Sequence, residues 1–444
     1  MSGLSDIAER VLAHVDSGAE AEVTITQGHE ALTRFANSYI HQNVAEDGAL
    51  VNLKVVLDGR VASSTTDRMG AESLERLAAQ AMEAARLQPV DSDWPGLTPP
   101  QDVRPLEHWD QGTAEASPAD RARLVKEFVG AGRGFEAAGY CQTTATNVVF
   151  ANSAGHLTED RFTNATLDGI HRDGAAAGSG HAASVRLADL DGESVGGLAF
   201  RRAKASIGAV DVKAGDYEVV LAQECVATIV MFMAFYGFNA KSHHEGQSFV
   251  KLGEDQFDPG FRLLDDATAE KGLHVGFDSE GSRKGPLVLI DGGVSRALAH
   301  DRRTARKAGT ETTGHALNFF GGYFGPIPTD LVVAPGPLSE DELVSSVEQG
   351  LYVTTFNYCR VLDPKTLVVT GLTRNGTFLI ENGRVTTPVT NLRFTQSFVE
   401  ALAPGQLKGV GSDDRHADSE FGAGFVHCPS LHLGSWHFTG GASG

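Results

Sequence analysis

One apolar run constrains the fold of this chain more than any other feature. Residues 225–240 read CVATIVMFMAFYGFNA and contain no charged side chain. The run is shorter than the roughly 20 apolar residues that a helix needs to cross a bilayer, so we expect a helix buried within protein. A helix that is apolar all round is expected to lie in a core or an interface.

The first half of the chain reads as helices that flank a meander of strands. Residues 4–15 show apolar side chains at helical spacing, and so do positions between Leu74 and Ala85. Strand-like runs cover 21–27, 31–44, 49–66, 141–150 and 155–166, and the third of them turns at the hairpin dipeptide Asp58-Gly59. Residues 88–118 hold six prolines and read as an irregular surface connection, at the end of which Ser117 caps a further helix. These patterns indicate an α+β fold.

The second half is richer in short β runs and glycine turns. A strand is expected at 217–221, a turn at 291–293, and a hairpin turn at Asn382-Gly383. Ser339 and Glu342 form the pattern of a capping box at the start of one helix. With 444 residues, the chain is too long for one ordinary core. We therefore predict an α+β protein with two domains, an N-terminal α+β domain over residues 1–210 and a β-rich C-terminal domain over residues 211–444.

The net charge indicates which kinds of partner are disfavoured, and the cysteines indicate the redox state of the compartment. The chain has 37 basic and 57 acidic residues, a net charge of −20, which disfavours direct contact with nucleic acid or an anionic membrane. The four cysteines are scattered without a paired motif, as is usual in a reducing compartment. The first residues lack the pattern of a signal peptide. A soluble, cytoplasmic protein is expected.

Two groups of residues are candidate metal ligands. His243, His244 and Glu245 resemble the start of a zinc-protease helix, but the second histidine of that motif would fall on Ser248 or Phe249. A C-terminal group comprises His427, Cys428, His432 and His437, of which two at a time would share a face of a strand. Neither group completes a metal site alone, and a structural or solvent-exposed role is the competing interpretation for both.

The remaining candidates are weaker. Neither the nucleophile motif of serine hydrolases nor a phosphate-binding glycine loop occurs, and the glycine-rich stretch 174–180 reads as turns. Residues 301–307, which include Arg302, Arg303 and Arg306, form a basic segment in an acidic protein. This segment could receive a carboxylate or an acidic partner, or it could be an ordinary solvated face.

Several stretches together resemble the TldD/PmbA family, whose members were named modulators of DNA gyrase. They include GPLVLIDGGV at 285–294, DRRTARKAGTETTGHAL at 301–317, GTFLIENGRVTTPVTNL at 376–392 and PSLHLGSWHFTGG at 429–441. The opening stretch AEVTITQGHEALTRFANSYIHQ resembles the family too. The resemblance implies a two-domain TldD/PmbA-like architecture and a cytosolic protease complex that acts on unfolded or peptide substrates. It also suggests His315, in the TTGHA block, as a contact for substrate or partner, together with Arg302, Arg303 and Arg306.

The catalytic subunit of that family carries zinc on an H-E-x-x-x-H helix and has a C-terminal cysteine. The same helix here would place the motif at residues 231–236, which read MFMAFY, and no H-E-x-x-x-H occurs anywhere in the chain. The chain therefore resembles the TldE subunit, with no metal or catalytic residue of its own and with zinc expected on a TldD-like partner. Whether a homodimer forms when the partner is missing stays open from the sequence.

Two alternatives stay open from the sequence. The first is an autonomous metallopeptidase with a non-standard zinc site that uses His243, His244 or Glu245 with His427 or Cys428. The second is a regulatory binding protein without proteolytic activity, against which the net charge of −20 argues if DNA is the target.

Overall fold

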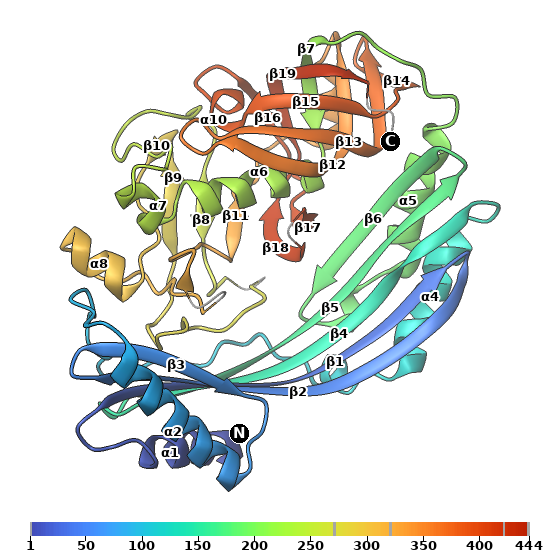
Figure 1. The fold of residues 1–444 in the computed structure, drawn as a ribbon. Helices are drawn as coiled ribbons and strands as arrows, with labels where there is room; N and C mark the ends of the chain where they lie inside the picture. Colours follow the sequence, from blue (N-terminus) through green and yellow to red (C-terminus); the bar gives the residue numbers. More distant parts are fainter. Residues whose placement is uncertain (1, 270–271, 319–321, 421, 442–444) are drawn as a thin grey trace.

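The computed structural model describes residues 2–269, 272–318, 322–420 and 422–441, and it has the predicted α+β fold. A long, curved antiparallel sheet forms the first half, and two further sheets with a central helix form the second half (Figure 1). The strands of the first sheet all precede residue 185, and those of the other two sheets all follow residue 214. This division agrees with the predicted domain boundary at residue 210, which itself stays a prediction.

The first sheet has six strands in the order β3-β2-β1-β4-β5-β6. Their bounds are β1 Glu20–Ala36, β2 Tyr39–Leu57, β3 Arg60–Thr66, β4 Glu136–Asn152, β5 Leu157–Asp173 and β6 Ala176–Ser184. The longer helices cover its convex face, and they are α1 Ser2–Ala13, α2 Ala71–Leu87, α4 Pro118–Ala131 and α5 Gly192–Ala205 (Figure 1). Side chains alternate between this helical layer and the concave face, so two small cores form under the helices while the concave face carries polar groups.

The turns of this half decide the length of its strands. The predicted turn at Asp58-Gly59 is confirmed, because both residues have the positive φ of a tight hairpin, 50° and 73°. The expected strand over 31–44 is wrong as one piece, since Asn37 and Ser38 also have positive φ and end β1 there. Asparagine tolerates the left-handed region better than most residues, which explains the missed turn.

The glycine-rich stretch 174–180 is only partly a turn. Gly174, at φ 58°, lies in the turn between β5 and β6, whereas Gly178 and Gly180 lie within β6. A Cβ on either of these two glycines would meet backbone atoms of α5 at 2.3 Å. These glycines therefore allow α5 to pack closely against β6. The hydrophobic periodicity of the sequence does not reveal such a contact.

The second half is built on two sheets. A seven-stranded sheet has the order β12-β7-β19-β15-β13-β14, with β16 paired to β19, and a six-stranded sheet has the order β10-β9-β8-β11-β18-β17. The strands of the first are β7 Gly215–Leu221, β12 Gln349–Asp363, β13 Val368–Glu381, β14 Arg384–Pro388, β15 Leu392–Ser397, β16 Leu407–Val410 and β19 Leu431–Gly441. Those of the second are β8 Leu263–Asp265, β9 Leu287–Asp291, β10 Val294–Ser295, β11 Leu331–Val333, β17 Arg415–Ser419 and β18 Gly422–Cys428.

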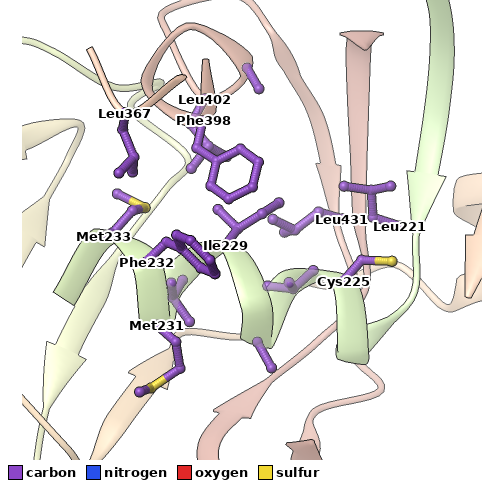
Figure 2. Close-up of a cluster of buried hydrophobic side chains, with 14 of the residues drawn as sticks. Leu221, Cys225, Ile229, Met231, Phe232, Met233, Leu367, Phe398, Leu402 and Leu431 are labelled. Atoms are coloured by element: carbon purple, nitrogen blue, oxygen red, sulfur yellow. The ribbon is translucent and has the colours of Figure 1, made fainter. Parts of the chain in front are cut away.

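The apolar run forms helix α6, Gln223–Tyr236, which lies between these two sheets (Figure 1). Every residue from Gln223 to Ala234 is buried, as predicted for a helix with apolar side chains on all sides. Ile229, Phe232 and Met233 point towards a layer that includes Phe398 and Leu402, while Met231 points away from it (Figure 2). None of the helices in the described part of the chain has the length and apolarity of a membrane span.

Short helices complete both halves of the chain. They are α3 Gln111–Ala114, α7 Ala240–His244, α8 Arg302–Ala308, α9 Glu340–Ser345 and α10 Phe398–Ala401, with a 3-10 turn at Leu187–Asp189. The N-cap predicted at Ser117 and the capping box predicted at Ser339 with Glu342 are both confirmed, and Asp120 completes a capping box with Ser117 as well. The irregular connection over 88–118 packs against both halves, because its Thr98 donates to the carbonyl oxygen of Glu280 and its His108 is buried.

The turn at Asn382-Gly383 yields a test of fold stability. Gly383 has φ 72°, and a Cβ there would meet the carbonyl oxygen of Ser345 at 2.6 Å. Gly383→Val should lower the free energy of unfolding by about 1–3 kcal/mol from backbone strain, with a further steric cost. Chemical denaturation measures this loss. The matched control is Glu381→Gln, whose side chain can still accept from Thr386, now 2.7 Å away, so stability should be unchanged. Equal stability of the two variants would contradict a structural role for the turn.

Candidate functional site

A polar cleft of about 960 Å³ opens where one end of the curved sheet meets the second half. Its walls come from β2 and β3, from Trp94 and Pro95 in the connection, from α7 and α8, and from the loops around Glu280 and Tyr323. Lysine, arginine, glutamate and aromatic side chains all line it. A cleft of this size that gathers polar groups from both halves is the default position for ligand binding.

Two neighbouring carboxyl groups have raised pKa values at the cleft: half-buried Glu280 lines it, and Asp278 is buried two residues earlier in the chain. Glu280 is held by the backbone N–H of Arg302, which donates to its Oε2 at 3.0 Å. Burial, and after it the nearby Asp278, raises the pKa of Glu280 to about 8, although Lys54 acts in the opposite direction. Burial also raises the pKa of Asp278 to about 6. A carboxyl group that keeps its proton near neutral pH can donate a hydrogen bond or act as a general acid.

A lysine from the curved sheet faces these acids. Lys54 and Glu22 are register partners on β2 and β1, and they form a close ion pair. Burial lowers the pKa of Lys54, but the charges of Glu22 and Glu280 outweigh this effect, so its pKa is raised and the ammonium group stays charged. The ammonium also lies 5.7 Å from the centroid of the Trp94 ring. The cleft thus combines a fixed cation with a protonated acid.

The basic segment 301–307 forms helix α8 at the edge of this cleft and contacts the irregular connection over residues 88–118. Arg302 donates to the carbonyl oxygen of Leu97 at 3.0 Å, and Arg306 donates to that of Trp94. Arg303 pairs with Asp91, and Lys307 lies 2.8 Å from Asp93. Two carboxylates of the chain itself, those of Asp91 and Asp93, thus form ion pairs with this segment. A contact of Arg302, Arg303 or Arg306 with substrate or partner stays a prediction.

His315, the other predicted contact residue, lies in the interior. Its Nε2 is 2.9 Å from Oδ1 of Asp265, and its Nδ1 is 2.9 Å from the Thr313 hydroxyl. The ring is buried and links its own loop to the end of strand β8. Its predicted contact with a ligand would need the loop and the strand to part.

The first group of predicted metal candidates lies beside the cleft. His244 and Glu245 line it from the end of α7, where both are exposed. The rings of His243 and His244 have centroids 6.4 Å apart, and the His300 ring lies 6.2 Å from that of His244. Three histidines therefore gather at one edge, but they belong to no group of three metal-ligating atoms within reach of one ion among the described residues.

The second group lies elsewhere, on β18 and β19. His427 is 3.3 Å from a carboxylate oxygen of Asp414, and its ring packs against that of His416. Cys428 is fully buried, donates to the carbonyl oxygen of Gln223 at 3.4 Å, and has its pKa raised by burial. His432 lies 2.7 Å from Glu218, and His437 lies 2.7 Å from Asp216. These residues belong to several separate contacts, so a shared metal site with His243 and His244 stays a prediction without support from the geometry.

Helix α6 is devoid of metal ligands at the positions that the resemblance points to. Residues 231–236 contain no histidine, cysteine or acid, and their aromatic rings pack on one another and on Phe398 and Phe324. A sequence profile described as the PmbA/TldA metallopeptidase C-terminal domain matches residues 214–440, more than half of the chain. The chain belongs to the TldD/PmbA family. A second profile, PmbA/TldA metallopeptidase domain 1, matches residues 21–85.

Individual relatives agree with this assignment. A metalloprotease of Methanothermobacter thermautotrophicus is 27% identical over 280 residues, which are 60% of either chain. A metalloprotease TldD homologue of Haemophilus influenzae is 27% identical over 209 residues, 46% of this chain and 43% of the relative. The alignments thus span less than two thirds of either relative. The crystal structure of TldE from Thermococcus kodakarensis has the same fold, with a TM-score of 0.86, 19% identity, and coverage of 98% of this chain and 99% of that chain.

Sequence reasoning missed the buried acids of the cleft. Asp278 and Glu280 occur in a polar stretch, DSEGSRKG, that resembles any surface loop. Their burial depends on Glu22, Lys54 and the connection, which lie far away in the sequence. No local pattern could have shown that this loop is covered.

The raised pKa of Glu280 predicts a pH-dependent stability effect. A pKa raised from 4.5 to about 8 means that the folded state disfavours the ionised form of Glu280. The stability that the protonated side chain contributes to the fold is therefore fully present below pH 4.5 and is lost as the pH rises through about 8. Glu280→Gln removes this dependence. The melting temperature of the variant relative to wild type should therefore rise between about pH 5 and about pH 9. Glu245→Gln, at the exposed edge of the same cleft, serves as control, and a difference that is constant with pH would show that Glu280 ionises normally.

Proposed function

We propose that this chain is a TldE-like subunit of a TldD/TldE-type zinc metalloprotease complex in the cytoplasm. In this proposal it does not hold the catalytic zinc. It pairs with a TldD-like subunit that does, helps to enclose a chamber, and binds unfolded or peptide substrates there. Without the partner it forms a homodimer or stays inactive.

The observation that carries the proposal is the chemistry of α6. The family's catalytic helix needs two histidines and a glutamate on one helix, since zinc in a catalytic site takes three protein ligands and keeps one position open. Met231, Phe232 and Tyr236 occupy the corresponding positions here. A thioether and two aromatic rings supply neither the ligands nor the base. Introducing histidines and a glutamate at these positions would place polar side chains in a packed apolar core.

The cleft supports the role in substrate binding. Strand β3 is at the edge of the described first sheet, and its residues Val61, Ala62, Ser63 and Thr65 line the cleft. An edge strand presents unpaired backbone groups, so an extended peptide can add to it whatever its sequence. Lys54, Trp94 and the protonated Glu280 lie beside that edge and can contact charged and apolar side chains of such a peptide.

An autonomous metallopeptidase is the second candidate, and one observation favours it. His243, His244 and His300 lie in a row at the edge of the cleft, with Glu245 and Glu280 nearby. Burial, followed by the charge of a neighbouring His244, lowers the pKa of His243 and His300, which keeps both imidazoles neutral. Neutral imidazole is the form that binds zinc.

The test measures hydrolysis of a fluorescently labelled unfolded polypeptide by the purified full-length chain, alone and after co-expression with a TldD-like homologue that has the intact zinc motif. We expect no hydrolysis by the chain alone, even with added zinc, and chelator-sensitive hydrolysis by the co-purified complex. Changing the motif glutamate of the TldD-like chain should abolish this activity, because that side chain acts as the base.

A matched variant of this chain discriminates between the two candidates. His243→Ala combined with His244→Ala should leave activity of the complex intact if the zinc is on the partner. Chelator-sensitive hydrolysis by the chain alone, lost in that double variant, would overturn the proposal in favour of the autonomous enzyme. Failure of the two co-expressed chains to elute together at micromolar concentration would also overturn it.

A further inference from the structure

A second titratable cluster lies away from the cleft, where the other end of the curved sheet meets β17. Asp168 on β5 and His181 on β6 are register partners, and Tyr140 on β4 lies opposite Asp168 in the same row. Directly opposed residues in a sheet point to the same face. Asp418 comes from β17 in the second half of the chain. One ligand atom each from Asp168, His181 and Asp418 lie within 4.8 Å of one another.

The imidazole of His181 is buried and has no hydrogen-bond partner among the described residues. Its side chain is 2% exposed, and both Nδ1 and Nε2 lack a partner that meets hydrogen-bond geometry. The nearest acid is Asp168, whose Oδ2 is 3.4 Å from Nδ1. Oδ1 of Asp418 is likewise buried without a partner. Buried polar atoms are nearly always satisfied, so atoms that converge in this way indicate a missing ligand.

The charges around the cluster indicate the sign of that ligand. Glu224 lies close by, at the start of α6. The guanidinium groups of Arg202 and Arg415 both form ion pairs with it. Arg202 also donates to the carbonyl oxygen of Ser179. Two cations therefore face three carboxylates, counting Asp168 and Asp418. Burial raises the pKa of Asp418 to about 6, opposed by His181 and reinforced by Asp168 and Glu224, as expected where negative charge is in excess.

We propose that Asp168, His181 and Asp418 form a binding site for one divalent first-row transition-metal ion, such as Zn²⁺. An imidazole nitrogen with two carboxylates is a donor set that these ions accept, whereas Ca²⁺ prefers six to eight oxygen ligands and Mg²⁺ retains most of its water. The 3.4 Å between His181 and Asp168 already suits two ligands of one zinc ion. Asp168, whose side chain is 29% exposed, leaves a side on which water can complete the coordination.

The ion would join the two halves of the chain. Two of its ligands lie on the concave face of the curved sheet, and the third lies on a strand of the six-stranded sheet. Binding therefore stabilises the contact between the halves and supplies no chemistry to the cleft. This inference does not rest on the proposed function, because none of residues 231–236 is among the three ligands and binding of the ion can be measured without a protease assay.

The test titrates the metal-depleted full-length chain with Zn²⁺, and in parallel with Mg²⁺, by calorimetry and by thermal unfolding. We expect one equivalent of Zn²⁺ to bind and to raise the melting temperature, and Mg²⁺ to do neither. His181→Gln and Asp418→Asn should each weaken Zn²⁺ binding by more than about 10-fold. A loss of about 10-fold is already usual when a residue that only supports a metal ligand is changed. His437→Gln, which alters an exposed pair of histidine and Asp216, is the matched control and should bind as wild type does.

A second readout covers variants that do not fold. The Co²⁺-loaded wild-type chain should show the visible absorption of a site with nitrogen and oxygen ligands, and Asp168→Asn, at the partly exposed position, should change that spectrum. Absence of stoichiometric binding to wild type would overturn the proposal. So would unchanged affinity in His181→Gln and Asp418→Asn, because the bound ion would then lie elsewhere.

Discussion

The complete burial of α6 is the constraint on which the rest of this structure depends. A helix satisfies its own backbone hydrogen bonds, so an apolar one can lie between two sheets at no polar cost. Its side chains reach the layer around Phe398 on one side and the six-stranded sheet on the other (Figure 2). Because both sheets close on this helix, their strands must be arranged around it. The same packing removes the helix from chemistry, since a Met or Phe that fills a core cannot also bind a metal.

The curved sheet meets the second half through buried charges rather than through one continuous core. At one end Glu224 contacts Arg202 and Arg415, and although burial opposes it, these cations lower the pKa of Glu224 to about 2. At the other end Glu280 is half-buried beside further acids, and its pKa rises to about 8. The residue type is the same, and the partner charges differ: cations surround Glu224, whereas acids lie beside Glu280. Buried ion pairs contribute little net stability but disfavour alternative arrangements, which suits a contact whose task is to fix the relative position of two halves.

Local signals in the sequence were sufficient for the elements but not for either candidate site. The caps at Ser117 and Ser339 and the turn at Asn382-Gly383 depend on residues that are near one another in the chain, and the structure confirms them. The family's architecture followed from blocks of sequence in the same way. By contrast, Asp168 and Asp418 are 250 residues apart, and they come together only because β17 docks on the concave face of the sheet. Nothing within a window of sequence distinguishes such residues from surface acids.

The basic segment shows how a correct chemical inference can still leave function open. From the sequence, residues 301–307 could either receive a carboxylate or form a solvated face, and in the structure Asp91 and Asp93 contact Arg303 and Lys307. Those acids belong to the connection, so α8 holds it against one wall of the cleft and thereby positions Trp94 beside Lys54. The arginines thus shape the cleft whether or not they touch a ligand. If the proposed function holds, the positive charge of this helix is largely used within the chain, and recognition of an extended peptide must depend on the open edge of β3 and on the protonated Glu280.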